Sequence, residues 1–274
     1  MKVVLITGAS SGFGFELSKA LLKKGYIVYA ASRNAQAMEP LKTLGAKILA
    51  MDVTKDESVK AGVAQLIQEQ GKIDAVFNNA GYGYYGLVEE PDMAQVLQMY
   101  ETNVFGLARV NNAVLPYMRK AKQGRLILTG SLVGNISLPG IGWYASTKHA
   151  VRALSESLRM ELLPFDIKVV LIEPGSVKTG FRDQAMGNIN TVTLKQDYTP
   201  FVENFSVFME EGYQHSPGPE ETVNAMVDAL ESKNPPWVYK TTKTARVYPR
   251  LKALLGSKRF YQTATKQIMG KQKR

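Results

Sequence analysis

The sequence of 274 residues contains no cysteine, which excludes disulfide bonds, thiolate catalysis and zinc–thiolate sites. It has only two histidines, His149 and His215, so we expect no metal site built on imidazole ligands. No uninterrupted apolar run approaches the ~18 residues that span a bilayer. The first apolar run begins at Val3, which leaves no room for a signal peptide, so the expected location is the cytoplasm.

Acidic residues are missing from the end of the chain. Residues 235–274 contain 11 lysines or arginines and no aspartate or glutamate, whereas residues 1–234 carry 23 basic and 24 acidic groups. The formal net charge of +10 therefore belongs to the tail, and we expect no nucleic acid partner for the rest of the chain. We divide the sequence into one domain over residues 1–240 and a basic, amphipathic C-terminal extension over residues 241–274.

Short apolar runs alternate with stretches of helical periodicity along the predicted domain. Its length and a composition of 45% hydrophobic and 21% charged residues suit a single globular unit. The alternation predicts an α/β fold with a doubly wound parallel sheet of about seven strands and helices on both faces. Ligands bind such sheets at the carboxyl ends of the strands. The expected strands are residues 3–6, 26–31, 46–51, 73–78, 125–129, 167–172 and 237–239.

A loop with three glycines, Thr7 to Gly14, joins the first strand to helix-like sequence. Glycines allow the backbone to approach a phosphate closely, and a helix N-terminus directs N–H groups and a positive dipole end toward it. A glycine-rich loop alone is often an ordinary turn, but the strand before it and the helix after it favour a dinucleotide site. The residues assigned to this site are Gly8, Ser10, Ser11, Gly12, Phe13 and Gly14.

Side chains after the next two strands bear on the choice of dinucleotide. Arg33 lies 19 positions after Gly14, where a fold that prefers NAD usually has an acidic residue. A guanidinium can bind the 2′-phosphate of NADP, so we predict NADP(H) as the cofactor; the alternative is a solvated arginine in a loop. Asp52, followed by Val53, either accepts a hydrogen bond from the adenine amino group or caps a helix.

Later segments add a candidate catalytic group. Asn79, Ala80 and Gly81 follow the fourth strand, where they either let the backbone lie close to a ligand or form a simple turn. Tyr144 and Lys148 are four residues apart in a helical stretch, which puts both on one helix face. A fixed positive charge near a phenol favours its ionised form, so this pair suggests a tyrosine acid/base with a lowered pKa.

Six elements together resemble the short-chain dehydrogenase/reductase family of single-domain enzymes, over residues 1 to about 232. They are the Thr7–Gly14 loop, the run from Asn78 to Gly81, Asn103, Ser131, the pair Tyr144 and Lys148, and Pro174 with Gly175. No hallmark position of the family is missing. The resemblance implies a Rossmann-type fold and an oxidoreductase that uses NADP(H).

The resemblance also implies roles for individual residues. Tyr144 would pass a proton to or from the substrate oxygen, and Ser131 would hydrogen-bond that oxygen. Lys148 would hold the nicotinamide ribose and lower the pKa of the tyrosine, while Asn103 would hold a water. The loop after the sixth strand would contact the nicotinamide through Pro174, Gly175, Val177 and Thr179.

The substrate is expected to be bulky and apolar. In the family, residues 181–219 form a substrate lid, where Phe201, Phe205 and Phe208 lie at helical spacing and either line a pocket or form a buried face. Local sequence is similar to that of hydroxysteroid and retinol dehydrogenases and of acyl-lipid ketone reductases. We therefore expect a steroid, retinoid or lipid-like carbonyl or alcohol as substrate, and a homo-oligomer. The alternative is a non-catalytic NADPH-binding regulator whose basic tail engages a partner.

The tail itself has apolar residues at helical spacing. Leu251, Leu254 and Leu255 share one face of a helix expected to begin near Pro249, and residues 260–268 could form another. We favour a segment that packs on its own domain or on a subunit partner. The alternative is weak peripheral contact with an anionic membrane surface.

Overall fold

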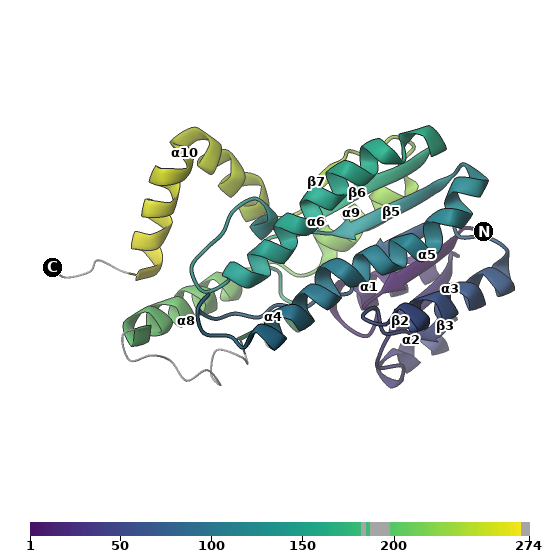
Figure 1. The fold of residues 1–274 in the computed structure, drawn as a ribbon, viewed down its shortest axis with the longest axis horizontal. Coiled ribbons are helices and arrows are strands. Elements are labelled where there is room, and N and C mark those ends of the chain that lie inside the picture. The colour runs from purple at the N-terminus through teal and green to yellow at the C-terminus, as the bar shows by residue number, and fades with distance from the viewer. Residues whose placement is uncertain (182–184, 187–197, 270–274) are drawn as a thin grey trace.

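The computed structural model describes residues 1–181, 185–186 and 198–269, and within them lies one seven-stranded parallel sheet (Figure 1). The strand order is β3-β2-β1-β4-β5-β6-β7. This confirms the predicted doubly wound sheet, with strand ends shifted by one or two residues. The strands are β1 (Val3–Thr7), β2 (Ile27–Ser32), β3 (Lys47–Ala50), β4 (Ala75–Asn78), β5 (Gly124–Thr129), β6 (Ile167–Glu173) and β7 (Val238–Lys240).

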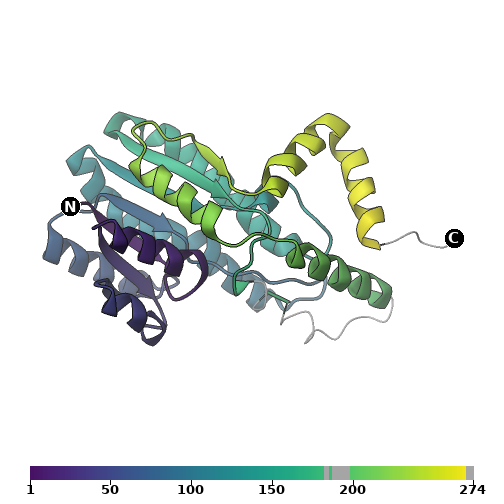
Figure 2. The ribbon, with the colours of Figure 1, turned by 180° about the vertical axis from the view of Figure 1, so that it is seen from behind.

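Helices cover both faces of the sheet, because alternate strand residues point to opposite faces and both sets are apolar. Val3 and Leu5 belong to one buried cluster, and Val4 and Ile6 belong to the other. The first cluster is covered by α3 (Asp56–Gln70), α5 (Gly106–Ala121) and α6 (Gly142–Glu161). The second, seen from behind in Figure 2, is covered by α1 (Gly12–Lys23), α2 (Glu39–Thr43) and α9 (Glu220–Glu231).

A short π-helical segment interrupts the helix that precedes β5. It spans Glu101–Phe105 between α4 (Met93–Tyr100) and α5. Such segments widen one turn and occur frequently at functional sites. Here the wide turn carries Asn103, whose side chain is buried.

The C-terminal segment packs on the rest of the chain. It follows α8 (Thr199–Gln214), α9 and β7, and forms α10 (Lys243–Met269), which bends at Gly256, where φ is 72°. Ala245 and Phe260 are buried against residues that follow β5, and Ile268 is buried in an aromatic cluster that includes residues of α8. Packing on its own domain is therefore confirmed, and Figures 1 and 2 both show α10 arching out from the body before it returns to α8.

The predicted start of the tail helix near Pro249 is wrong. The helix begins six residues earlier, at Lys243, because Thr242 Oγ1 accepts a hydrogen bond from the backbone N–H of Ala245 at 3.2 Å and so caps it. The leucine face is also divided, because Leu255 packs inward while Leu254 is 83% exposed. No helix in the described part of the chain is long and apolar enough to cross a membrane.

Candidate active site

The glycine loop after β1 packs its backbone directly against the backbone that follows β4. A Cβ atom on Gly8, whose φ is 67°, would lie 2.7 Å from the Cα of Ala80, and one on Gly14 would lie 2.5 Å from the carbonyl oxygen of Gly8. A side chain at either position would therefore push the loop away from the end of β4. Ser11 precedes α1 without a side-chain cap among the described residues, so the first N–H groups of the helix are available to an anion. This cradle fits the pyrophosphate of a dinucleotide.

Nearly all the predicted site residues line one cavity of ≈ 1250 Å³ at the carboxyl edge of the sheet. The two exceptions are Gly14, which lies behind Gly8, and Asn103. The Asn103 side chain accepts from the backbone N–H of Tyr82 at 3.0 Å and donates to its carbonyl at 2.9 Å. It also donates to Thr147 Oγ1 at 3.1 Å. Its side chain therefore fixes the loop after β4 to helix α6.

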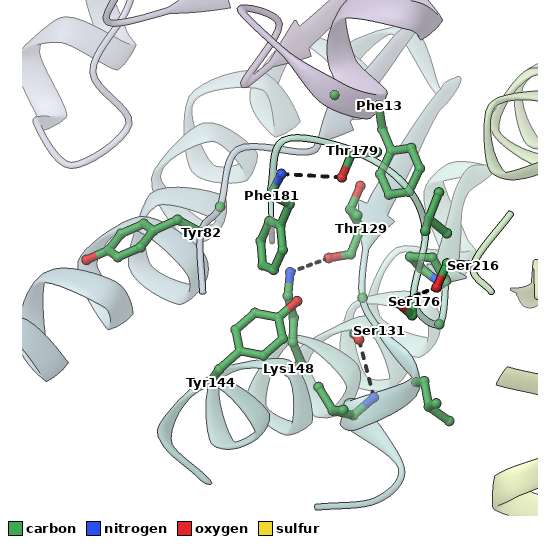
Figure 3. Close-up of a pocket in the computed structure, with 18 of the residues that line it drawn as sticks. Phe13, Tyr82, Thr129, Ser131, Tyr144, Lys148, Ser176, Thr179, Phe181 and Ser216 are labelled. Atoms are coloured by element: carbon green, nitrogen blue, oxygen red, sulfur yellow. Dashed lines mark hydrogen bonds between the residues drawn. The ribbon is translucent and has the colours of Figure 1, made fainter. Parts of the chain in front are cut away.

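Tyr144, Lys148 and Ser131 converge on the same part of this cavity (Figure 3). Tyr144 and Lys148 are one turn apart on α6, and the Lys148 ammonium lies 5.8 Å from the centre of the Tyr144 ring. The ammonium donates to the carbonyl oxygen of Thr129, the last residue of β5, at 2.8 Å. Ser131, two residues beyond that strand, lines the same corner, and its hydroxyl accepts a hydrogen bond from the backbone N–H of Val133 at 3.3 Å. The geometry thus joins a phenol, a hydroxyl and a cation in one buried corner.

Burial dominates the electrostatics of this corner. Loss of solvent raises the pKa of Tyr144 above its ordinary value of 10, the neighbouring Tyr85 raises it further, and the nearby Ser131 hydroxyl offsets part of the rise. This direction is opposite to the one expected from the Tyr144–Lys148 pair alone. Burial also lowers the pKa of Lys148 from 10.5 to about 8. At pH 7 the phenol is therefore protonated and the ammonium is charged.

Arg33 and Asp52 lie at the nucleotide end of the cavity. The Arg33 side chain is exposed and forms no ion pair or hydrogen bond with another described residue. Asp52 accepts from the backbone N–H of Thr54 at 2.9 Å and from its hydroxyl at 2.8 Å, so one carboxylate oxygen caps a local turn before α3. These bonds, with Arg33 contributing, hold the pKa of Asp52 below its ordinary value despite burial. Asp52 therefore holds a turn and does not cap the helix as the alternative expected, because the N-cap residue of α3 is Lys55 and no side-chain cap bond from a described residue forms there.

The loop after β6 is held by residues that sequence analysis missed. Gly175 donates its backbone N–H to Thr242 Oγ1 at 3.1 Å, and a Cβ on Gly175 would collide with the hydroxyls of Thr242 and Thr244. In the same loop, Ser176 Oγ accepts a hydrogen bond from Ser216 Oγ at 2.7 Å. The carbonyl oxygen of Thr179 accepts one from the Tyr213 hydroxyl at 3.1 Å. The cap of α10 therefore also positions this loop, and the only signal in the sequence is the Thr-Thr pair before a helix.

A buried ion pair also escaped the sequence analysis. Glu173, the last residue of β6, is 1% exposed, and its Oε1 lies 2.6 Å from an Arg152 nitrogen. Arg152 lies one turn beyond Lys148 on α6 and also donates to Asn135 Oδ1 at 2.7 Å. The pair ties the catalytic helix to the strand that leads into Pro174. No local pattern predicts this contact, because the partners come from distant segments.

Aromatic side chains surround the substrate end of the cavity. The Tyr144 ring lies 6.1 Å from that of Tyr85 and 5.5 Å from that of Phe181, centre to centre. Phe201 and Phe205 of α8 stack at 5.7 Å and are buried, whereas Phe208 lines the cavity. The two alternatives for these phenylalanines, a buried face and the lining of a pocket, therefore both occur within α8. Part of the predicted lid, residues 182–184 and 187–197, lies outside the described residues.

The doubly wound sheet and its cavity define a dinucleotide-binding protein of the Rossmann type. A sequence model of the short chain dehydrogenase family matches residues 2–189. The chain is 38% identical over 238 residues to a 3-ketodihydrosphingosine reductase of Bacteroides thetaiotaomicron, with 86% of each chain covered. It is 30% identical over 287 residues to retinol dehydrogenase 8 of Homo sapiens, covering 98% of this chain and 90% of the relative.

A crystal structure of a short-chain dehydrogenase from Streptomyces avermitilis matches with a TM-score of 0.82 and 29% identity, covering 97% of this chain and 96% of the other. The protein therefore belongs to the short-chain dehydrogenase family, and it is an oxidoreductase of that family. The family resemblance stated from the motifs is confirmed.

Proposed function

We propose that this protein is an NADP-dependent enzyme that interconverts a bulky, apolar ketone or aldehyde and the corresponding alcohol. The observation that carries the proposal is the corner of Tyr144, Ser131 and Lys148, which lies between the glycine cradle and the aromatic end of one cavity. NADPH bound along this cavity would supply the hydride. The side chains of the protein would supply the proton and stabilise the charge that develops on the substrate oxygen.

Tyr144 acts as the proton donor when the carbonyl is reduced. Its raised pKa keeps the phenol protonated at neutral pH, and only a protonated group can donate to an oxygen that gains negative charge. Ser131 hydrogen-bonds the same substrate oxygen and stabilises its developing charge. Lys148, fixed by Thr129 and charged below about pH 8, stabilises the phenolate left behind after the transfer.

Arg33 supports the choice of NADP over NAD. Its guanidinium is exposed at the nucleotide end of the cavity, and no described carboxylate pairs with it. An unpaired guanidinium offers two parallel hydrogen bonds to a 2′-phosphate. The residues that would hold the remainder of the dinucleotide are the glycine cradle, Asn79 to Gly81 and the loop after β6.

A lipid-like substrate is supported by two observations. The substrate end of the cavity is lined by apolar rings, including Tyr85, Phe181 and Phe208, which favour apolar surface over charge. The two relatives described above are named for a sphingoid ketone and for retinol, and each of these molecules has a large hydrocarbon portion. We therefore propose a long-chain or polycyclic carbonyl compound as the substrate.

The test is NADPH and NADH oxidation by the purified protein against ketones and aldehydes of one series with increasing chain length. We expect turnover with NADPH, a lower KM as the chain lengthens, and much weaker turnover with NADH. Equal use of both dinucleotides would contradict the role of Arg33, and a preference for short polar ketones would contradict the substrate class. Tight NADPH binding without turnover across the series would favour a regulator instead.

A further inference from the structure

The first arm of α10, before the bend at Gly256, has two different faces. Its inner face packs on the body through Ala245, Tyr248 and Leu255. Its outer face carries Val247, Leu251 and Leu254, which are 43%, 37% and 83% exposed. These three residues follow the spacing i, i+4, i+7, so they form one continuous apolar stripe on the side that faces away from the protein. These three residues form the outer stripe of α10.

The charge of α10 is entirely of one sign. Between Lys243 and Met269 the sequence contains seven basic and no acidic residues. Arg246 pairs with Glu221 at 2.7 Å, and Lys252 donates to the carbonyl of Asn135 at 2.9 Å. The remaining five form no ion pair with any described residue: Lys243, Arg250, Lys258, Arg259 and Lys266. Arg250 lies next to the outer stripe, and Lys258 follows the bend.

Residues of this helix also line the cavity of the candidate site. Tyr248 on the first arm and Gln267 near the end of the second arm both line the cavity. Figures 1 and 2 show the two arms standing out from the sheet on the side where α8 lies. A surface that bound the outer stripe would therefore lie close to a helix that lines the cavity.

A second copy of this chain is a poor occupant of the outer stripe. In a two-fold contact the stripe of one subunit would meet the same helix of the other, so the basic residues of one first arm would face those of its copy with no acidic residue of α10 between them. An apolar stripe flanked by unpaired lysine and arginine instead matches a surface that is negatively charged and has an apolar interior. A bilayer with anionic headgroups has both properties.

We propose that the outer stripe and the free basic residues of α10 dock the protein on an anionic membrane surface. Val247, Leu251 and Leu254 enter the boundary between headgroups and acyl chains, and Arg250, Lys258 and Arg259 contact the headgroup phosphates. In this position the cavity, which Tyr248 and Gln267 of α10 line, lies near the bilayer, where a lipid-borne carbonyl is concentrated. This last consequence rests on the proposed function, whereas the docking itself does not.

The test is cosedimentation of the full-length protein with vesicles of phosphatidylcholine, alone or mixed with an equal amount of phosphatidylglycerol. We expect binding to the anionic vesicles that falls as salt is raised, and little binding to phosphatidylcholine alone. In the variant Leu251→Glu/Leu254→Glu the partition coefficient should fall at least about tenfold. The variant Arg250→Gln/Lys258→Gln should also bind less, and it leaves the apolar stripe intact.

The matched control is Leu163→Glu. Leu163 is 76% exposed but lies in the short turn between α6 and β6, away from α10, so vesicle binding should stay unchanged. Turnover of a short, water-soluble ketone measures the proposed function separately and should be equal in all four proteins. Absence of binding to anionic vesicles at low salt, or equal binding by wild type and the leucine variant, would overturn the proposal. Conversion of an oligomer to monomers by the leucine variant would overturn it too, because the stripe would then be a subunit interface.

Discussion

The two ends of the cavity are built in different ways. At the nucleotide end, the glycine cradle uses main-chain atoms of one short segment, in which Gly8 and Gly14 allow contacts that any side chain would block. The substrate end uses aromatic side chains from α6, α8 and two loops, which lie far apart in the sequence. The cradle is therefore a local property of the chain, whereas the substrate end depends on how distant segments pack. Tyr144 lies where the two ends meet.

The largest effect should come from removing the hydroxyl at that meeting point. Tyr144→Phe keeps the ring and its packing but removes the proton donor, so kcat should fall by about 10²- to 10⁴-fold. The affinity for NADPH, measured by fluorescence titration, should stay within about twofold of wild type, because the nucleotide end is built separately. Tyr100→Phe is the control. The Tyr100 hydroxyl on α4 donates to Ser146 Oγ on α6, the helix that carries Tyr144, at 2.9 Å, and neither residue lines the cavity. A comparable loss of kcat in both variants would assign the effect to helix α6 rather than to the phenol.

The buried pair of Arg152 and Glu173 connects helix α6, near the meeting point of the two ends, to the start of the loop after β6. Arg152→Met leaves a carboxylate that is 1% exposed without its cation, so the free energy of unfolding should fall by about 3 kcal/mol or more. Urea denaturation measures this change. A second substitution, Glu173→Leu, removes the stranded charge and should recover more than half of the loss. If the double variant is as unstable as the single one, packing rather than charge accounts for the effect.

The dinucleotide preference depends on a side chain and should change without disturbing the backbone cradle. Arg33→Asp places a carboxylate where a 2′-phosphate would bind, so KM for NADPH should rise by about 10- to 100-fold while KM for NADH stays the same or falls. Arg119→Asp introduces the same charge change at an exposed position on α5 and should leave both constants unchanged. An equal rise in both KM values for Arg33→Asp would mean that the residue supports the fold of the cradle.

The smallest predicted effect concerns stability and pH. The pKa of Lys148 is lowered to about 8 in the folded protein, below the ordinary 10.5, so the unfolded chain binds more protons between these values. Wild-type stability therefore gains a contribution as pH rises from about 8 to 10.5. Lys148→Met removes the cost of burying the charge and should stabilise the protein by about 1 to 3 kcal/mol at pH 7 while activity is lost.

The gain from Lys148→Met should shrink as the pH approaches 10.5, which thermal unfolding at several pH values will measure. The control is Lys120→Met, an exposed lysine on α5, where no such pH-dependent gain is expected. A constant gain for Lys148→Met at all pH values would show that the improved stability does not come from deprotonation of the lysine.

Sequence patterns predicted the fold and the nucleotide end because both depend on short-range features. The apolar runs located the strands, and the spacing of Tyr144 and Lys148 placed both on one face of α6. The patterns failed where an outcome depends on burial or on distant partners. The direction of the Tyr144 pKa shift follows from burial among distant segments, which no local sequence specifies. The start of α10 follows from the cap at Thr242, which also holds Gly175, a residue far away in the sequence.

The central claim is that protonated Tyr144 donates the proton to the carbonyl oxygen when NADPH transfers a hydride to the carbonyl carbon of a bulky, apolar substrate. The most direct test is a single-turnover experiment in which wild type and Tyr144→Phe, both saturated with NADPH, are mixed with one long-chain ketone and NADPH fluorescence is recorded. The account predicts a rapid loss of fluorescence in wild type and a loss slower by about 10²-fold or more in the variant, with equal NADPH bound at the start. Equal rates in the two proteins, or stable NADPH fluorescence in wild type with every ketone of the series, would contradict it.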